Sequence, residues 1–178
     1  MRSTSRFATV LGLSLAFLSC RAASAGMPMR PAPAPDALRE GIALYQSGKY
    51  AEASSALQEA KGTEADAYKA AALVKQKKYE EAEAPARAAA SAEPSNEIAV
   101  TAVGESLVHL KKYDDAVDIL SASIKAEPDM AYAYFWRAQA YQGQKKVDRM
   151  MQDFDTFLKL APKAPEAAAV RQTLSALK

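Results

Sequence analysis

The two residue types most often used for covalent catalysis and metal binding each occur once in this sequence, as Cys20 and His109. A nucleophilic cysteine needs a base such as histidine beside it, and a zinc site needs several such ligands together. Cys20 lies in an apolar N-terminal segment, apart from the region that contains His109. The sequence also has no nucleophile motif and no glycine-rich phosphate loop. We therefore expect a protein that is not an enzyme and uses no metal or cofactor, with His109 as a surface or groove residue.

Residues 1–25 have the three-part organisation of a secretory signal peptide. Arg2 and Arg6 precede an apolar run over residues 7–18, and small residues follow up to Ala25. The apolar run is too short to cross a membrane as a helix. We expect cleavage after Ala25 and an exported protein, either periplasmic or secreted.

Cys20 supports a second interpretation of the same segment. Phe17-Leu18-Ser19-Cys20 resembles the end of a bacterial lipoprotein signal, in which a small residue precedes the lipid-attachment cysteine. Ser19 fits that pattern, whereas Phe17 and Leu18 depart from it. Lipidation at Cys20 would make the protein a membrane-anchored lipoprotein, whereas cleavage after Ala25 would remove its only thiol. We favour cleavage and keep lipidation as the alternative.

The charge of the chain depends on this N-terminal segment. The formal net charge of the full chain is +2, and residues 1–25 contain three arginines and no acid, so the remainder carries 2 − 3 = −1. Nucleic-acid binding relies on a clustered positive surface. We therefore expect no nucleic-acid partner. Residues 26–35 are rich in proline, which favours an extended, semi-rigid linker.

Landmark residues recur every 34 residues through the rest of the chain. An aromatic or branched residue and, later, a proline mark each unit, and both series keep the same step (113 − 79 = 34 and 128 − 94 = 34). The landmarks are Tyr79, Tyr113 and Val147, followed by Pro94, Pro128 and Pro162. A fixed period of this length predicts stacked helical hairpins, because one hairpin cannot bury its apolar face alone.

The third unit shows the helical pattern most clearly. Val100, Val103, Gly104 and Leu107 follow the spacing of one helix face, and a second apolar stripe begins at Tyr113 after a short turn. A small residue in the first helix, an aromatic residue opening the second and a closing proline resemble the tetratricopeptide repeat (TPR) family. The resemblance covers about residues 34–164.

This resemblance implies an all-α fold, an α-solenoid of four TPR-like hairpins with a C-terminal capping helix. The expected hairpins span about residues 36–61, 63–94, 97–128 and 131–162, within an array at 36–164, and the capping helix spans 165–178. The first unit is irregular because its aromatic residue, Tyr50, lies only 79 − 50 = 29 residues before the next one. We expect Lys61-Gly62 to end its second helix and Thr63 to open the next helix as part of a capping box.

In the TPR family, the first helix of each hairpin lines a concave surface that binds an extended peptide or a partner helix. The positions left over from the core stripes of the first helices are therefore the candidate partner-binding groove. They are Arg39, Tyr45, Tyr68, Glu105, His109, Tyr132, Trp136 and Gln139. Aromatic residues are enriched at protein interfaces. The competing interpretation is that Phe135 and Trp136 pack against the capping helix or a neighbouring hairpin.

The basic-and-asparagine clamp by which some TPR proteins hold C-terminal carboxylates is missing. Apolar or small residues, including Ala71, Thr101 and Ala102, occupy the first-helix faces where the clamp would be expected. We therefore do not expect recognition of a C-terminal carboxylate.

Lysines recur at the predicted hairpin turns and are followed by acids within a few residues. The turn lysines are Lys49, Lys77-Lys78, Lys111-Lys112 and Lys145-Lys146. A lysine ridge could bind anions, but lysine at one helix C-terminus and acid at the next N-terminus also complement the helix dipoles. We favour the helix-end interpretation.

Together these features predict a non-enzymatic scaffold or adaptor that binds a protein or peptide outside the cytoplasm. The alternatives are a lipid-anchored structural subunit of an envelope assembly and a self-associating, homo-oligomeric TPR module. A membrane would be a partner only if Cys20 is lipidated.

Overall fold

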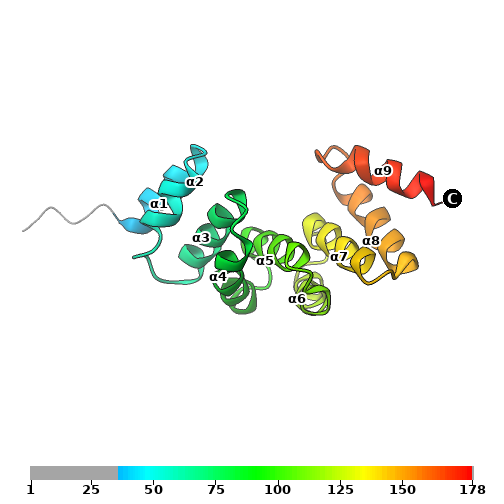
Figure 1. The fold of residues 1–178 in the computed structure, drawn as a ribbon, viewed down its shortest axis with the longest axis horizontal. Coiled ribbons are helices and arrows are strands. Elements are labelled where there is room, and N and C mark those ends of the chain that lie inside the picture. The colour runs from blue at the N-terminus through cyan, green and yellow to red at the C-terminus, as the bar shows by residue number, and fades with distance from the viewer. Residues whose placement is uncertain (1–35, 178) are drawn as a thin grey trace, which may run out of the picture. The chain divides into compact units, whose positions relative to one another are not determined.

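The computed structural model describes residues 36–177, which form nine α-helices and no β-strand within that range (Figure 1). The helices are α1 (Ala37–Gln46), α2 (Tyr50–Ala56), α3 (Thr63–Lys75), α4 (Tyr79–Ala92), α5 (Glu97–His109), α6 (Tyr113–Ala126), α7 (Ala131–Gly143), α8 (Val147–Leu160) and α9 (Ala167–Ala176). The expected all-α fold of four hairpins and a final helix is confirmed. The expected signal segment, Cys20 and the proline-rich linker lie outside the described residues.

The helices pack as antiparallel hairpins, each stacked on the next. The pairs are α1 with α2, α3 with α4, α5 with α6, and α7 with α8. The first helices also contact one another in series, from α1 to α3, α5 and α7, so they form one layer of the stack, while α9 packs on α8. Among the described helices, none has both the length and the apolar character that crossing a bilayer requires.

All four hairpins turn in the same way, on one residue with a left-handed backbone. Gly48 has φ 79° in the first turn, and Lys77, Lys111 and Lys145 have φ 61°, 60° and 60° in the other three. The N–H of the following residue donates to a carbonyl five residues earlier, as from Lys112 to Leu107 at 2.8 Å. This is the Schellman closure of a helix C-terminus. It accounts for the start of each second helix directly after a lysine.

Two apolar clusters make up the core. One is built from small and branched side chains of α3 to α7, among which Val100, Leu107 and Leu120 are buried. The other contains the phenylalanines of α7 and α8 and is closed by Val170 and Leu174 of α9. α9 therefore covers apolar side chains of the last hairpin that would otherwise face water, as a capping repeat of a helical array does.

The link between the first two hairpins differs from the expectation. α2 ends at Ala56 and Leu57 caps it, so the helix stops before Lys61-Gly62. Gly62, with φ 110°, is the N-cap of α3, and its N-cap makes no side-chain hydrogen bond. The predicted capping box at Thr63 is therefore wrong. Thr63 already lies in the first turn of the helix, where its hydroxyl is not in the N-cap position.

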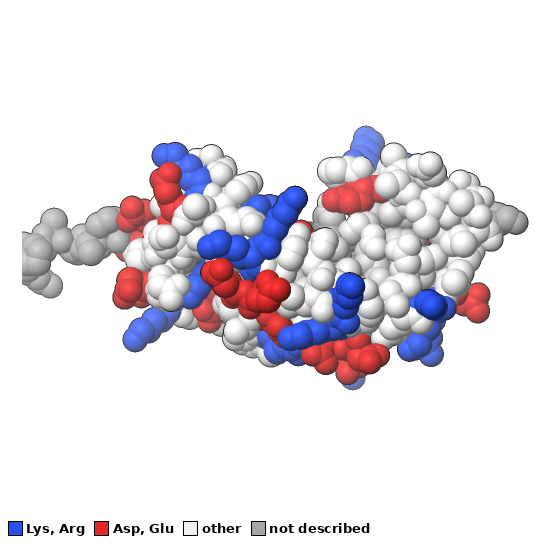
Figure 2. Space-filling model, viewed as in Figure 1, with Lys and Arg blue, Asp and Glu red and all other residues white. Residues whose placement is uncertain are grey.

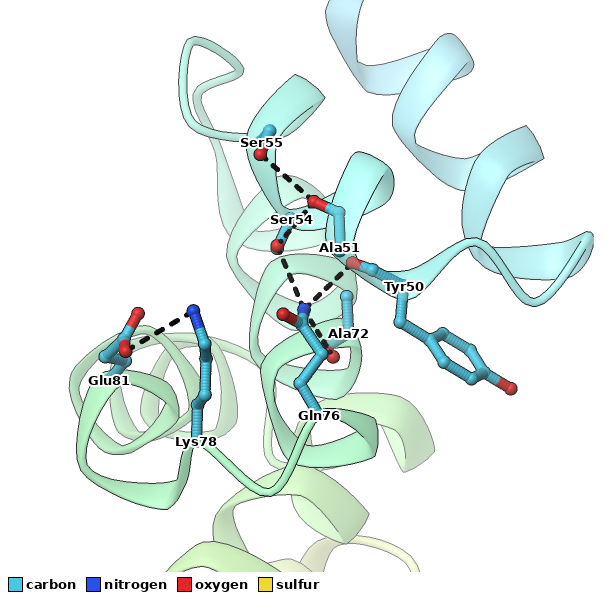
Figure 3. Close-up of polar contacts among 8 residues, drawn as sticks. All are labelled: Tyr50, Ala51, Ser54, Ser55, Ala72, Gln76, Lys78 and Glu81. Carbon is cyan, nitrogen blue, oxygen red and sulfur yellow. Dashed lines mark hydrogen bonds and ion pairs between the residues drawn. The ribbon is translucent and has the colours of Figure 1, made fainter.

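A glutamine side chain joins these two irregular hairpins. Nε2 of Gln76, at the C-terminus of α3, donates to the carbonyl oxygen of Tyr50 at 2.9 Å and to Oγ of Ser54 at 3.0 Å (Figure 3). It also lies 3.1 Å from the carbonyl oxygen of Ala72 in its own helix. Gln76 thus holds α2 against the end of α3 where the shortened α2 offers little apolar surface.

A charged pair holds the last hairpin together. Nε and Nη2 of Arg137 in α7 donate to the two carboxylate oxygens of Asp153 in α8, at 2.7 and 2.8 Å. Nη1 of Arg137 also donates to Oγ of Ser121 in α6 at 3.0 Å. The two-pronged geometry of guanidinium and carboxylate fixes both the distance and the rotation of the helices. The same arginine therefore orients the fourth hairpin on the third.

Candidate functional site

A single groove is lined by the first helices of all four hairpins. It encloses about 220 Å³ and is bounded by ten residues of α1, α3, α5 and α7. They are Tyr45, Ala71, Val74, Lys75, Glu97, Ile98, Thr101, Ala102, Glu105 and Tyr132. Small-molecule sites usually enclose about 300–1,000 Å³. The groove is therefore sized for a side chain or a short segment of a polypeptide.

Tyrosines form one side of the groove. The ring of Tyr45 in α1 lies 5.5 Å from the ring of Tyr68 in α3, at an interplanar angle of 75°, and 5.5 Å from that of Tyr50. Edge-to-face pairs of this kind fix the orientation of the rings. Burial, then Tyr50, Tyr68 and Glu105, raise the pKa of Tyr45, so its phenol stays neutral at physiological pH.

Glu105 of α5 lies on the floor of the groove and is partly buried. No hydrogen bond or ion pair joins its carboxylate to another residue of the described range. Burial raises the pKa of Glu105, opposed by the positive charge of Lys75 and the influence of His109, and reinforced by Glu166. The carboxylate therefore has lost part of its hydration without gaining a partner.

α9 brings a second carboxylate to the edge of the groove. The hydroxyl of Tyr132 donates to Oε2 of Glu166, the residue before α9, at 2.9 Å. Burial and this hydrogen bond, together with the nearby Glu97, raise the pKa of Tyr132 to about 12. Glu97 and Glu105 line the groove and Glu166 borders it, whereas Lys75 is the one basic residue in its lining. Negative charge therefore predominates.

Trp136 and Phe135 do not line the groove. Phe135 is buried in the cluster that α8 and α9 complete. Trp136 is half-buried against α5, and its ring lies 5.0 Å from that of Phe135. Its indole Nε1 is buried and has no hydrogen-bond partner among the described residues. The structure thus places both aromatic residues in the packing between helices, as the competing interpretation had it.

The remaining candidates are separated from one another. His109 is exposed at the end of α5 and stacks on Tyr79 of α4, with ring centroids 4.2 Å apart and an interplanar angle of 8°. Arg39 lines a different hollow, on α1 alone. Gln139 is half-buried on α7 outside the groove lining. Of the eight candidate residues, the groove brings together Tyr45, Glu105 and Tyr132, with Tyr68 packed behind Tyr45.

The sequence analysis did not include several residues that line the groove. The repeat itself contains the missing signal, because subtracting 34 from candidates on α5 and α7 gives groove residues. Tyr132 leads to Ile98, and Trp136 leads to Ala102. Likewise, Glu105 leads to Ala71 and His109 leads to Lys75. Glu166 carried no such signal, since it follows the last repeat and reaches the groove only through the docking of α9.

The lysines at the hairpin turns lie close to acids. Nζ of Lys49, Lys78 and Lys112 lies 3.7, 3.6 and 2.6 Å from carboxylate oxygens of Glu52, Glu81 and Glu83. On the face drawn in Figure 2, basic and acidic side chains are interspersed. Exposed pairs of this kind contribute little stability, but they cancel one another at a distance. Within residues 36–177, no group of three or more histidine, cysteine or acidic side chains is arranged to hold a metal ion.

Comparison with known proteins agrees with this architecture. A family model described as tetratricopeptide repeat matches the sequence over residues 68–127 and 101–165. The two matches together extend from residue 68 to residue 165, more than half of the 178-residue chain. A search of curated proteins found no match.

Several solved structures share the fold. MamA 41-end from Desulfovibrio magneticus RS-1 has a TM-score of 0.63 at 21% identity, over 79% of this chain and 82% of that one. YrrB, described as a TPR protein with an unusual peptide-binding site, has a TM-score of 0.64 at 16% identity, over 74% and 71%. TTC0263, a thermophilic TPR protein of Thermus thermophilus, has a TM-score of 0.62 at 18% identity, over 79% of each chain. At these identities, the likeness concerns the fold alone.

Proposed function

Because this chain belongs to the tetratricopeptide repeat family, we propose that it is a non-enzymatic interaction scaffold whose groove binds an extended peptide or protein segment. TPR repeat proteins are typically scaffolds of this kind. The observation that carries the proposal is that four consecutive first helices, and no second helix, line one groove. The description of YrrB as a TPR protein with a peptide-binding site, on a similar fold, supports a peptide as the ligand.

The groove has the chemical character that binding a polypeptide requires. Tyr45 and Tyr132 offer rigid aromatic surface, and Ile98 and Val74 add apolar contact. Thr101 and Glu105 provide polar atoms that can fix the orientation of a bound segment. Binding sites of this composition rely on a few aromatic anchors, while the surrounding contacts exclude water.

A matched pair of variants tests the proposal. Thr101→Trp places a large side chain in the groove, whereas Ala122→Trp places the same side chain on an exposed position of α6, away from it. Peptides would be selected from a random display library on the full chain and then measured individually by calorimetry. We expect selected peptides to bind the Ala122→Trp variant normally and to lose binding to Thr101→Trp. Equal binding to both variants would remove the groove from the function.

We also propose that the scaffold acts outside the cytoplasm, after removal of residues 1–25. The basis is the pattern of Arg2, the apolar run over residues 7–18 and the small residues ending at Ala25. Intact mass spectrometry of the protein expressed in a Gram-negative host separates the alternatives. A mature chain beginning at Gly26 supports export by cleavage. A chain with an acylated Cys20 supports the membrane-anchored lipoprotein, and an unprocessed chain contradicts both.

A second candidate function is self-association through the C-terminal end of the stack. Val147 and Leu177 there are 43% and 47% exposed, and both border a hollow between α7, α8 and α9. Such an apolar end could join two copies or attach the chain as a structural subunit of an envelope assembly. Light scattering over a concentration series tests the self-associating form. A monomer mass at every concentration would exclude it.

A further inference from the structure

We propose that the segment bound in the groove carries a basic side chain, Arg or Lys, whose positive charge pairs with Glu105. This inference rests on the proposed peptide-binding function and names the chemistry of its ligand. It follows from three features of the groove: its unpaired carboxylate, its excess of acids and its tyrosines.

The carboxylate of Glu105 is the feature of the groove that most lacks a partner. A charged group taken out of water is costly unless it is paired or hydrogen-bonded. Glu105 is partly buried, and no described residue pairs with it or donates a hydrogen bond to it. A cation delivered by a ligand would supply the missing partner. Such a pair would gain more from the groove than from the exposed surface, because screening by water is weaker there.

The surroundings of Glu105 add to the negative charge. Glu97 lines the groove, and Glu166 accepts the hydrogen bond of Tyr132 at its edge. Lys75 is the opposing charge, but its side chain is exposed at the C-terminal end of α3, where a positive charge also complements the helix dipole. Three acids therefore face one lysine that does not form an ion pair with any of them. A C-terminal carboxylate would be repelled by the same arrangement.

The tyrosines suit the stem and the charge of a basic residue. Tyr45 and Tyr132 border the groove from α1 and α7, on either side of the α3 and α5 residues. Aromatic faces attract cations, and the methylene stem of Arg or Lys packs on apolar surface while its head reaches a carboxylate. The volume of about 220 Å³ suits one long side chain better than a larger ligand.

The test compares charged and neutral forms of the same peptides. Peptides that bind the full chain and lose binding to Thr101→Trp would be resynthesised with citrulline in place of Arg, or acetyl-lysine in place of Lys. We expect the neutral forms to bind about tenfold or more weakly, and Glu105→Gln to weaken the charged form by a similar factor. The neutral form should bind wild type and Glu105→Gln equally. Glu80→Gln, the same charge change at an exposed position of α4, should leave the affinity unchanged.

The outcomes separate the two proposals. Groove-dependent peptides without a basic residue, or peptides that bind equally well when neutralised, would overturn the inference and leave the peptide-binding function in place. A library that yields no groove-dependent peptide would overturn both. A charged peptide whose affinity does not respond to Glu105→Gln would show that another acid holds the cation and would refute the role given to Glu105.

Discussion

Trp136 of α7 packs directly on Gly104 of α5, where a Cβ atom would lie 2.7 Å from Cβ of Trp136. A separation below 3.0 Å is not tolerated by real Cβ atoms, so only glycine allows α7 to approach this closely. Cδ2 of Leu120 in α6 lies 3.2 Å from the same position, which closes the site from the other side. The spacing of α5 and α7 sets how far apart Glu105 and Tyr132 stand across the groove.

Gly104→Ala should lower the stability of the protein. Helix propensity alone would favour alanine by about 1 kcal/mol. The clash with Trp136 involves an atom attached directly to the backbone, so α5 and α7 must separate, and overpacking of this kind costs about 1–3 kcal/mol. We expect the clash to outweigh the propensity in the free energy of unfolding measured with urea. A variant more stable than wild type would show that the two helices adjust without cost.

Asp153→Asn should destabilise the protein by about 3 kcal/mol. The side chain of Asp153 is 6% exposed, and its substitution leaves the guanidinium of Arg137 without its counter-charge. Breaking one partner of a buried pair is costly because the other charge stays buried. Glu52→Gln breaks the exposed pair with Lys49 and should change the stability by less than about 0.5 kcal/mol. Urea unfolding of both variants makes the comparison, and similar losses would contradict it.

Lys145→Gly should stabilise the fourth hairpin. Lys145 has φ 60°, a conformation that costs an L-residue about 1–2 kcal/mol and costs glycine almost nothing. After allowing for the greater freedom of glycine in the unfolded chain, we expect a net gain of about 0.5–1 kcal/mol. Lys146→Gly is the matched control, because Lys146 has φ −90° and gains no such relief. Thermal unfolding should rank the control below wild type, and a reversed order would refute the explanation.

Glu105→Gln should stabilise the unliganded protein in a pH-dependent manner. Burial raises the pKa of Glu105 above its ordinary 4.5, so the folded state holds this proton more tightly than the unfolded state. The resulting stability is present below pH 4.5 and is lost as the pH rises through the raised pKa. The melting temperature of the variant should therefore exceed that of wild type at pH 7, and the difference should shrink towards pH 4. His109, Lys75 and Glu166 also influence Glu105, so the wild type and the variant are compared at each pH.

A difference that stays constant from pH 4 to pH 7 would contradict this prediction, because the effect would then not come from the charge of Glu105. The prediction is independent of any ligand. It concerns only the cost of holding an unpaired carboxylate in the groove, which the proposed basic ligand would offset.

The sequence was sufficient to predict the hairpins because their signals are local and repeated. The 34-residue step located the turns, and buried Ala82, Ala116 and Met150 occupy the same place in successive second helices. The first hairpin was predicted less well. α2 stops at Ala56 and Gly62 takes the N-cap of α3, because burial of Leu57 and the hydrogen bonds of Gln76 determine that link through contacts between helices.

The candidate site was predicted only in part for the same reason. Tyr45, Glu105 and Tyr132 were identified from their places on first helices, and the structure brings them to one groove. Trp136 occupies a first helix too, yet the open space above Gly104 draws it into the packing between α5 and α7. Helical periodicity assigns a residue to a face, but it does not say which neighbour that face will meet.

The sequence by itself therefore determined the repeat, the hairpins and the helices that line the groove, since these depend on spacing along the chain. Only the tertiary structure decided that Glu105 stands without a partner, that Trp136 packs on Gly104, and that α9 brings Glu166 to Tyr132. These relationships join residues about 30 or more positions apart, and they depend on how closely the helices pack, which no local pattern encodes.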